Sequence, residues 1–185
     1  MTVISMARSL GTAALGVGAA LALAGCERKE LEAGAPVSGG ARAVASMVTS
    51  DGAPAGRATA TEVAGGVRFT LDAMGVPAGT HGAHVHMTGR CDGPDFTSAG
   101  GHWNPTAAKH GTMNPQGPHQ GDLPNLIVGT DGRGTIGITI PGATMAGLLD
   151  ADGSAMMVHA NADDLMTDPS GNSGGRIACG VFQPG

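Results

Sequence analysis

The chain has 185 residues and a formal net charge of −5, so it suits a single domain and lacks the basic surface of a nucleic-acid-binding protein. Charged residues make up 14% of it, which is too few for a disordered polyampholyte, and aromatic residues make up only 2%, so any core must be aliphatic. Its 33 glycines and 11 prolines favour an all-β domain with long loops over a helical bundle.

The segment at residues 1–25 is typical of an export signal peptide. Arg8 precedes residues 10–24, an uncharged stretch of apolar and small residues that is too short for a comfortable membrane span. The segment ends in Leu-Ala-Gly and is followed by Cys26, which resembles a bacterial lipobox and implies cleavage before Cys26 and diacylation of that cysteine. We therefore expect an exported, periplasmic protein that a lipid anchor at Cys26 holds on a membrane. An ordinary signal peptide followed by an incidental cysteine is the alternative.

Residues 26–41 carry charges and then Gly, Ala, Pro and Ser, which predicts a flexible tether between the anchor and a domain at residues 42–185. Two cysteines remain in that domain, Cys91 and Cys179. Because exported proteins enter an oxidising compartment, we predict a disulfide bond between them. The chain-entropy model assigns so long a loop a stabilisation of roughly 4–5 kcal/mol, as an upper value. Two free, buried thiols are the alternative.

Apolar and β-branched residues, alternating with polar ones in the clearest cases, predict eight short strands in the domain. They cover residues 43–49, 57–63, 67–73, 83–87, 126–130, 135–140, 155–159 and 177–182. Asp131 and Gly132 separate two of these strands and predict a hairpin. Residues 88–123 and 160–175 show no periodicity and are predicted to be two long loops, which in a compact domain are normally functional. The pattern predicts an eight-stranded β-sandwich or flattened barrel without helices.

Six histidines and one aspartate suggest a metal site on and around the first long loop. His84 and His86 alternate on a predicted strand, so both imidazoles lie on one face and can reach one ion. The other members are His102, His110, His119, Asp122 and His159. Imidazole suits zinc and copper, and a carboxylate can complete a tetrahedral zinc site. A set of solvated loop histidines that binds no metal is the alternative.

The same residues lie in six sequence blocks that resemble the signatures of the copper–zinc superoxide dismutases. In chain order the blocks are His81-Gly82-Ala83-His84-Val85-His86, Gly101-His102-Trp103-Asn104-Pro105, Lys109-His110-Gly111, His119-Gln120-Gly121-Asp122-Leu123, residues 158–164 and residues 171–181. The resemblance spans about residues 42–183. It implies a Greek-key β-sandwich and an exported bacterial enzyme of the lipoprotein type.

The resemblance also implies the roles of individual residues. The copper ligands would be His84, His86, His102 and His159, and the zinc ligands would be His102, His110, His119 and Asp122. His102 would then bridge both ions, while Asp163 would link His84 to His110. Asp163 could instead be an ordinary loop or cap residue. His81 would be structural and not a ligand.

The implied reaction is the dismutation of superoxide to dioxygen and hydrogen peroxide by a redox-cycling copper. His102 and Arg176 would be the catalytic residues, because His102 moves a proton and Arg176 attracts the anionic substrate. Residues 160–175 contain no lysine, so Arg176 is the nearby cation that the sequence identifies. A surface salt-bridge partner is the alternative interpretation of Arg176.

Two other functions remain open on the same fold. A non-enzymatic copper/zinc-binding module would bind both ions without turnover. An adhesion protein with a β-sandwich fold would use metal only to hold a loop in place. All four copper positions and Arg176 are present, which favours the enzyme. Bacterial members of this family vary in oligomeric state, so a homodimer is one assembly open to the chain.

Overall fold

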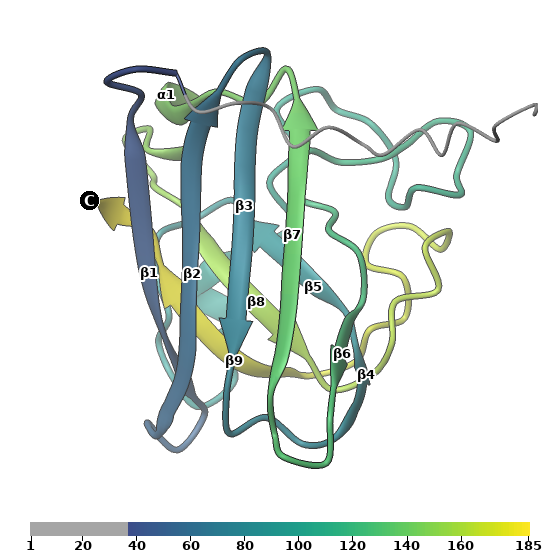
Figure 1. Ribbon diagram of the computed structural model, residues 1–185. Coiled ribbons are helices and arrows are strands. Elements are labelled where there is room, and N and C mark those ends of the chain that lie inside the picture. Colours follow the sequence, from purple (N-terminus) through teal and green to yellow (C-terminus); the bar gives the residue numbers. More distant parts are fainter. Residues whose placement is uncertain (1–36) are drawn as a thin grey trace, which may run out of the picture. The chain divides into compact units, whose positions relative to one another are not determined.

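Figure 1 shows a computed structural model of the chain, in which residues 37–185 are described. The predicted signal peptide, Cys26 and most of the predicted tether lie outside the described residues. Within residues 37–185, no helix has the length and apolar character needed to cross a membrane.

The described residues contain ten strands and two short helical segments. The strands are β1 (Arg42–Thr49), β2 (Pro54–Val63), β3 (Gly66–Ala73), β4 (Gly79–His81), β5 (Ala83–His86), β6 (Leu126–Val128), β7 (Gly134–Pro141), β8 (Ala155–His159), β9 (Arg176–Val181) and β10 (Gln183–Pro184). The helical segments are a 3-10 turn, η1 (Thr97–Ala99), and the one-turn helix α1 (Met145–Leu148), which Thr144 caps through its side chain.

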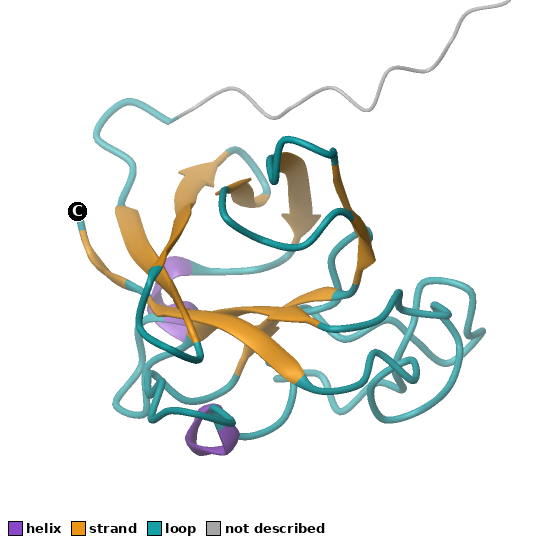
Figure 2. Ribbon diagram, turned by 90° about the horizontal axis from the view of Figure 1, so that it is seen from below, coloured by secondary structure: helices purple, strands orange, loops and turns teal. Residues whose placement is uncertain are grey.

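Eight strands form one antiparallel sheet in the order β5-β8-β9-β1-β2-β3-β7, with β10 added beside β1. The sheet curls over, so that β1, β2, β3 and β7 form one layer and β5, β8 and β9 form the other (Figures 1 and 2). The two long loops lie at the same side of this structure, next to each other in both views. The predicted eight-stranded sandwich or flattened barrel with two long loops is therefore confirmed.

Some local predictions are wrong. The strands β4 and β10 and the two helical segments were not expected, because segments of two to four residues carry too little periodicity to detect. The predicted hairpin forms its turn, where the Gly129 N–H donates to the Arg133 carbonyl oxygen at 2.8 Å. However, β6 pairs with β4, and β7 pairs with β3 along its whole length. Turn residues show that the chain reverses there, but they do not determine which strand becomes the partner.

The core between the layers is aliphatic, as the composition required. Strands β1 and β2 contribute fully buried alanines, and β3 contributes Val67, Phe69 and Leu71. The Phe69 ring meets Trp103 and Phe182 edge to face, at centroid distances of 6.5 and 6.0 Å. Because Trp103 belongs to the long loop 88–123, its burial anchors that loop in the core.

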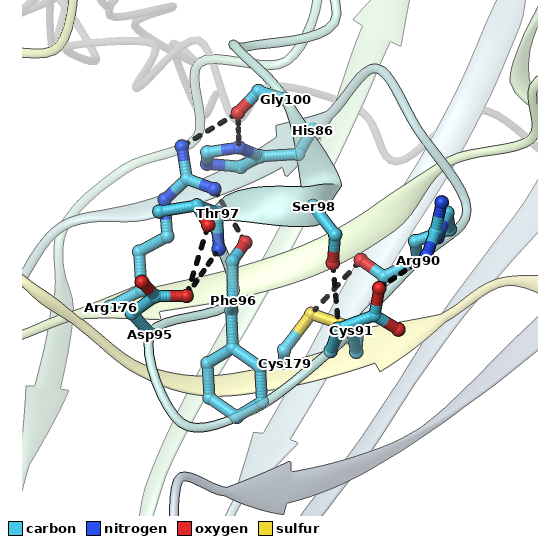
Figure 3. The surroundings of a disulfide bond; sticks show 11 residues. His86, Arg90, Cys91, Asp95, Phe96, Thr97, Ser98, Gly100, Arg176 and Cys179 are labelled. Atoms are coloured by element: carbon cyan, nitrogen blue, oxygen red, sulfur yellow. Dashed lines mark hydrogen bonds and ion pairs between the residues drawn. A yellow bond between two sulfur atoms is a disulfide. The ribbon is translucent and has the colours of Figure 1, made fainter.

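A second apolar cluster lies on the outer face of β8 and β9, beneath the first part of the same loop. It contains Phe96, Ala99, Ala155, Met157 and Cys179. A disulfide bond joins Cys179 on β9 to Cys91 on the loop, as predicted (Figure 3). Trp103 therefore holds the loop in the core, on the inner face of the layer formed by β5, β8 and β9. The disulfide holds the loop on the outer face of the same layer.

Reduction of the Cys91–Cys179 bond is expected to lower thermal stability and metal retention together. The bond closes a separation of 88 residues, for which chain entropy predicts a loss of up to about 4–5 kcal/mol. The measurement is unfolding and released metal with and without reductant, with the double variant Cys91→Ser/Cys179→Ser as the control that reductant should not affect. Wild-type stability that does not change on complete reduction would contradict this role.

Candidate metal centre

Strand β5 is buried on both faces, because one face covers the core and the other is covered by loops. Ala83 and Val85 pack into the core cluster, whereas His84 and His86 alternate with them and face outward. His159 ends the neighbouring strand β8, on the face opposite to the core residues Met156 and Val158. The three histidines therefore share the outer face of this layer.

Two segments of the long loop extend the free edge of β5. The Val85 N–H donates to the Gly121 carbonyl oxygen at 2.9 Å, and the Trp103 N–H donates to the Val85 carbonyl oxygen at 2.8 Å. These bonds place His102 opposite His86 and Asp122 opposite His84. A side chain at Gly121 would overlap the Val85 carbonyl oxygen, so the close approach requires glycine there.

Four buried imidazoles converge at the outer face of β5. One ring nitrogen from each of His84, His86, His102 and His159 lies within 4.8 Å of the others. His86 Nδ1 lies 2.9 Å from the Gly100 carbonyl oxygen, and His159 Nδ1 lies 3.1 Å from that of Gly174. Their Nε2 atoms face each other at 3.4 Å. Backbone acceptors thus orient both rings and leave Nε2 for the centre of the cluster.

Asp122 is the focus of a second buried cluster. Its Oδ1 lies 2.9 Å from His102 Nδ1, 3.0 Å from His110 Nδ1 and 3.2 Å from His119 Nδ1. Its Oδ2 accepts the N–H groups of Gly111 and His119 at 2.8 and 2.9 Å. Ligand atoms of His84, His102, His110 and Asp122 all lie within 4.8 Å of one another. His119 also contacts this group, because its Nδ1 lies 3.4 Å from His102 Nδ1.

Asp163 lies between the two clusters. Its Oδ2 is 2.7 Å from His84 Nε2, and its Oδ1 is 3.0 Å from His110 Nε2. Asn125 holds the Asp163 backbone through two hydrogen bonds of 2.8 Å. A side chain at Gly171, whose φ is +60°, would overlap the Asp163 carboxylate. One buried carboxylate therefore orients one histidine of each cluster.

Arg176 begins β9 at the edge of a surface pocket of about 480 Å³ that His86, His102 and His159 also line. Its guanidinium donates to the carbonyl oxygens of Phe96 and Gly100, both at 2.6 Å (Figure 3). These carbonyls belong to the loop segment that the disulfide ties to β9. Met87 and Ser170 also line the pocket. They lie outside the six sequence blocks, so the sequence analysis did not identify them.

Burial and neighbouring charges separate the pKa values of the histidines in the metal-free protein. Burial lowers the pKa of His84 to about 4 and that of His159 to about 3, and it lowers the pKa of His86 well below 6.5. Burial also opposes protonation of His110, but hydrogen bonds to Asp122 and Asp163 outweigh it and raise the pKa of His110 to about 9. His84, His86 and His159 are therefore neutral at pH 7, the form that binds metals.

These pKa shifts predict that the metal-free protein is most stable near pH 6.5, the ordinary histidine value. As the pH falls below 6.5, the histidines of the unfolded state bind protons. In the folded state, buried His84 and His159 stay neutral until about pH 4 and 3, so stability decreases as the pH falls. Above it, the unfolded state loses a proton that His110 keeps until about pH 9, so stability falls as pH rises. Urea unfolding with chelator at pH 5, 6.5 and 8.5 measures this. A steady rise from pH 5 to 8.5 would contradict it.

The structure thus defines a β-sandwich protein with two adjoining clusters of side chains that could hold metal ions beneath its long loops. Residues 54–182 match the sequence profile of the family described as copper/zinc superoxide dismutase (SODC). The chain therefore belongs to the copper/zinc superoxide dismutase family.

Individual proteins agree with this assignment. The superoxide dismutase [Cu-Zn] of Caulobacter vibrioides is 44% identical over 148 residues, which cover 76% of this chain and 85% of that protein. The crystal structure of a SOD-like protein from Bacillus subtilis superposes with a TM-score of 0.71 at 39% identity, covering 76% of this chain and 97% of the other. The Cu/Zn superoxide dismutase of Brucella abortus gives a TM-score of 0.63 at 28% identity, covering 77% and 99%. As a member of the family, the chain is an enzyme that dismutes superoxide with copper and zinc as cofactors.

Proposed function

We propose that His84, His86, His102 and His159 hold the copper of this dismutase. The observation that carries the assignment is a pair of unsatisfied atoms. His84 Nδ1 and His102 Nε2 are buried and have no hydrogen-bond partner among the described residues. Leaving one such group unpaired costs about 1–3 kcal/mol, so native proteins rarely do so. A metal ion between them would satisfy both nitrogens, and the residues present fit the cofactor.

The zinc ligands proposed are His102, His110, His119 and Asp122. His102 presents Nδ1 to Asp122 and leaves Nε2 for the copper side, which supports a bridging role. Although His84 also lies within 4.8 Å of the ligand atoms around Asp122, its Nε2 contacts Asp163 at 2.7 Å. Its Nδ1 is then available to the copper side alone. His119, in contact with both Asp122 and His102, completes the zinc set.

Bound copper supplies one-electron redox chemistry, in which one superoxide is oxidised to dioxygen and a second is reduced to peroxide. The remaining work belongs to the chain. Arg176 supplies a positive charge at the pocket and attracts the anion. His102 Nε2 would alternate between the copper side and a proton, which it delivers to the reduced substrate, while its Nδ1 would stay on the zinc side. Asp163 keeps His84 and His110 in position. Two protons and two superoxide ions thereby give one dioxygen and one hydrogen peroxide.

The non-enzymatic metal-binding module is the rival to test. Such a module requires the two clusters but neither an open pocket nor a cation beside it. This protein has the open pocket, and Arg176 supplies the cation. Metal analysis combined with a superoxide disappearance assay on the purified protein separates the functions. One copper and one zinc per chain with rapid disappearance supports the proposal, whereas both metals without turnover would support the module. Zinc without copper would support the adhesion protein.

Replacing Arg176 by alanine is expected to lower the second-order rate at least several-fold without removing copper. Arg176→Glu should be slower still because it adds repulsion. The rate of Arg176→Lys should lie between those of wild type and Arg176→Ala. Lysine keeps the charge but lacks the planar guanidinium that donates to two carbonyl oxygens. Added salt should slow wild type more than Arg176→Ala. Pulse radiolysis at several ionic strengths measures this; equal rates and salt slopes for wild type and Arg176→Glu would place steering elsewhere.

We also propose that the protein is exported and lipid-anchored. The support is the uncharged stretch at residues 10–24 and the lipobox-like residues that end at Cys26. The Cys91–Cys179 bond agrees with an oxidising compartment such as the periplasm. Mass spectrometry of the processed protein should find a diacylated Cys26 as its first residue. A soluble product that starts elsewhere, or a Cys26→Ser variant that fractionates with membranes like wild type, would contradict the anchor.

A further inference from the structure

Met87 is a half-exposed methionine beside the proposed copper ligands. It follows His86 directly, and 50% of its surface is exposed to solvent. Its N–H donates to the Gly101 carbonyl oxygen at 2.9 Å, which holds it against the loop. It lines the same pocket as His86, His102 and His159.

One glycine, Gly100, leaves room for the Met87 side chain, whereas Gly101 lies at an ordinary contact distance from its sulfur. A Cβ at Gly100, whose φ is +72°, would lie 3.1 Å from Met87 Cγ, and a Cβ at Gly101 would lie 4.0 Å from Met87 Sδ. The Gly100 carbonyl oxygen also accepts from His86 and from Arg176. One copper-side imidazole and the guanidinium are therefore both hydrogen-bonded to the glycine beside which the Met87 side chain lies.

A thioether at this position has a specific chemical preference. Soft, polarisable sulfur ligands select copper(I), whereas zinc is bound by imidazole, carboxylate and thiolate and copper(II) suits imidazole nitrogen. Among residues 37–185, three other methionines expose more than two-fifths of their surface, namely Met74, Met113 and Met166. None of these three lines the pocket with the histidines. Exposure alone therefore does not distinguish Met87, but its position among copper-side imidazoles does.

We propose that Met87 is the docking ligand for copper(I) during loading of the metal centre. The thioether binds the ion at the mouth of the pocket and transfers it to His86 and His159 by ligand exchange, with no change in oxidation state. The inference rests on the copper assignment of those histidines. In the loaded protein the four imidazoles hold the ion, so Met87 affects the rate of loading and not the final copper content.

The test uses the full chain, zinc-loaded and copper-free, under anaerobic conditions. Copper(I) is offered as its bicinchoninate complex, and the decay of the absorbance of that complex reports uptake. Met87→Leu should take up copper(I) about tenfold more slowly, which corresponds to about 1.4 kcal/mol in the barrier. Met87→Gln, which keeps the length but not the sulfur, should behave in the same way. Met74→Leu, at a similarly exposed methionine in a different pocket, should load as fast as wild type.

Copper(II) uptake distinguishes a ligand from a change in pocket shape. Both Met87 variants should take up copper(II) at the wild-type rate, because imidazole nitrogen serves that ion without sulfur. Equal copper(I) rates for wild type and Met87→Leu, or equal slowing for copper(I) and copper(II), would overturn the inference. If wild type itself retains no copper, or His159→Ala retains as much as wild type, the copper assignment fails instead.

Discussion

Replacement of His159 by alanine is expected to abolish dismutation while zinc stays bound. His159 lies in the cluster with His84, His86 and His102, and its Nε2 faces His86 Nε2 at 3.4 Å. No hydrogen bond connects its ring to Asp122, because its Nδ1 faces the Gly174 carbonyl oxygen at 3.1 Å. The substitution should therefore remove one copper ligand and leave the zinc cluster intact.

The expected loss of activity exceeds about 100-fold, because residues that merely orient metal ligands already account for 10- to 100-fold effects. The measurement is superoxide disappearance with copper and zinc content determined on the same sample. His119→Ala is the matched control, since it lies in the other cluster and should reduce zinc content first. Full activity in His159→Ala, with copper at the wild-type level, would show that the redox centre is elsewhere.

Replacement of Asp122 by alanine is expected to cause a large loss of stability and to remove zinc. Three imidazole nitrogens lie within 3.2 Å of its Oδ1, and two backbone N–H groups donate to its Oδ2. Asp122 is buried, and burial raises its pKa, but the hydrogen bonds from His102 and His110 outweigh burial and hold that pKa far below its usual range. Removing the carboxylate takes one of two buried counter-charges away from His110, and breaking a buried ion pair in this way typically costs about 3–5 kcal/mol.

The test compares urea unfolding and zinc content of wild type, Asp122→Ala and Asp122→Asn. Asparagine keeps the shape and one acceptor oxygen but not the charge, so it should lose zinc while retaining part of the stability. Copper should bind more weakly in both variants, because His102 is shared and loses its partner on the zinc side. A wild-type zinc content in Asp122→Ala would remove Asp122 from the proposed ligand set.

Much of the metal centre follows from local sequence. Alternation on a strand is a property of the backbone itself, so His84 and His86 share a face whatever surrounds them. The absence of periodicity in residues 88–123 likewise shows that something other than strand pairing must hold that segment. The histidines in the segment indicated that a metal ion does so. The aliphatic core and the disulfide followed from composition and from the small number of cysteines.

Other features depend on contacts between residues far apart in the chain. The sequence predicted a hairpin of β6 and β7, yet β6 pairs with β4, because the hydrogen-bonding partner of a strand depends on which edges the rest of the sheet leaves free. The free edge of β5 likewise receives Trp103 and Gly121 from the loop. No local pattern marks that pairing, although it brings His102 and Asp122 to the centre.

The sequence by itself determined which residue types could bind metal, the face on which two of them lie and the class of fold. Only the tertiary structure decided which nitrogen of His84 and His102 stays unpaired, how two carbonyls hold Arg176, and that Met87 lies at the pocket. The physical reason is that residue identity limits which bonds a side chain can make. Its actual partners are those that folding brings within about 3 Å of it.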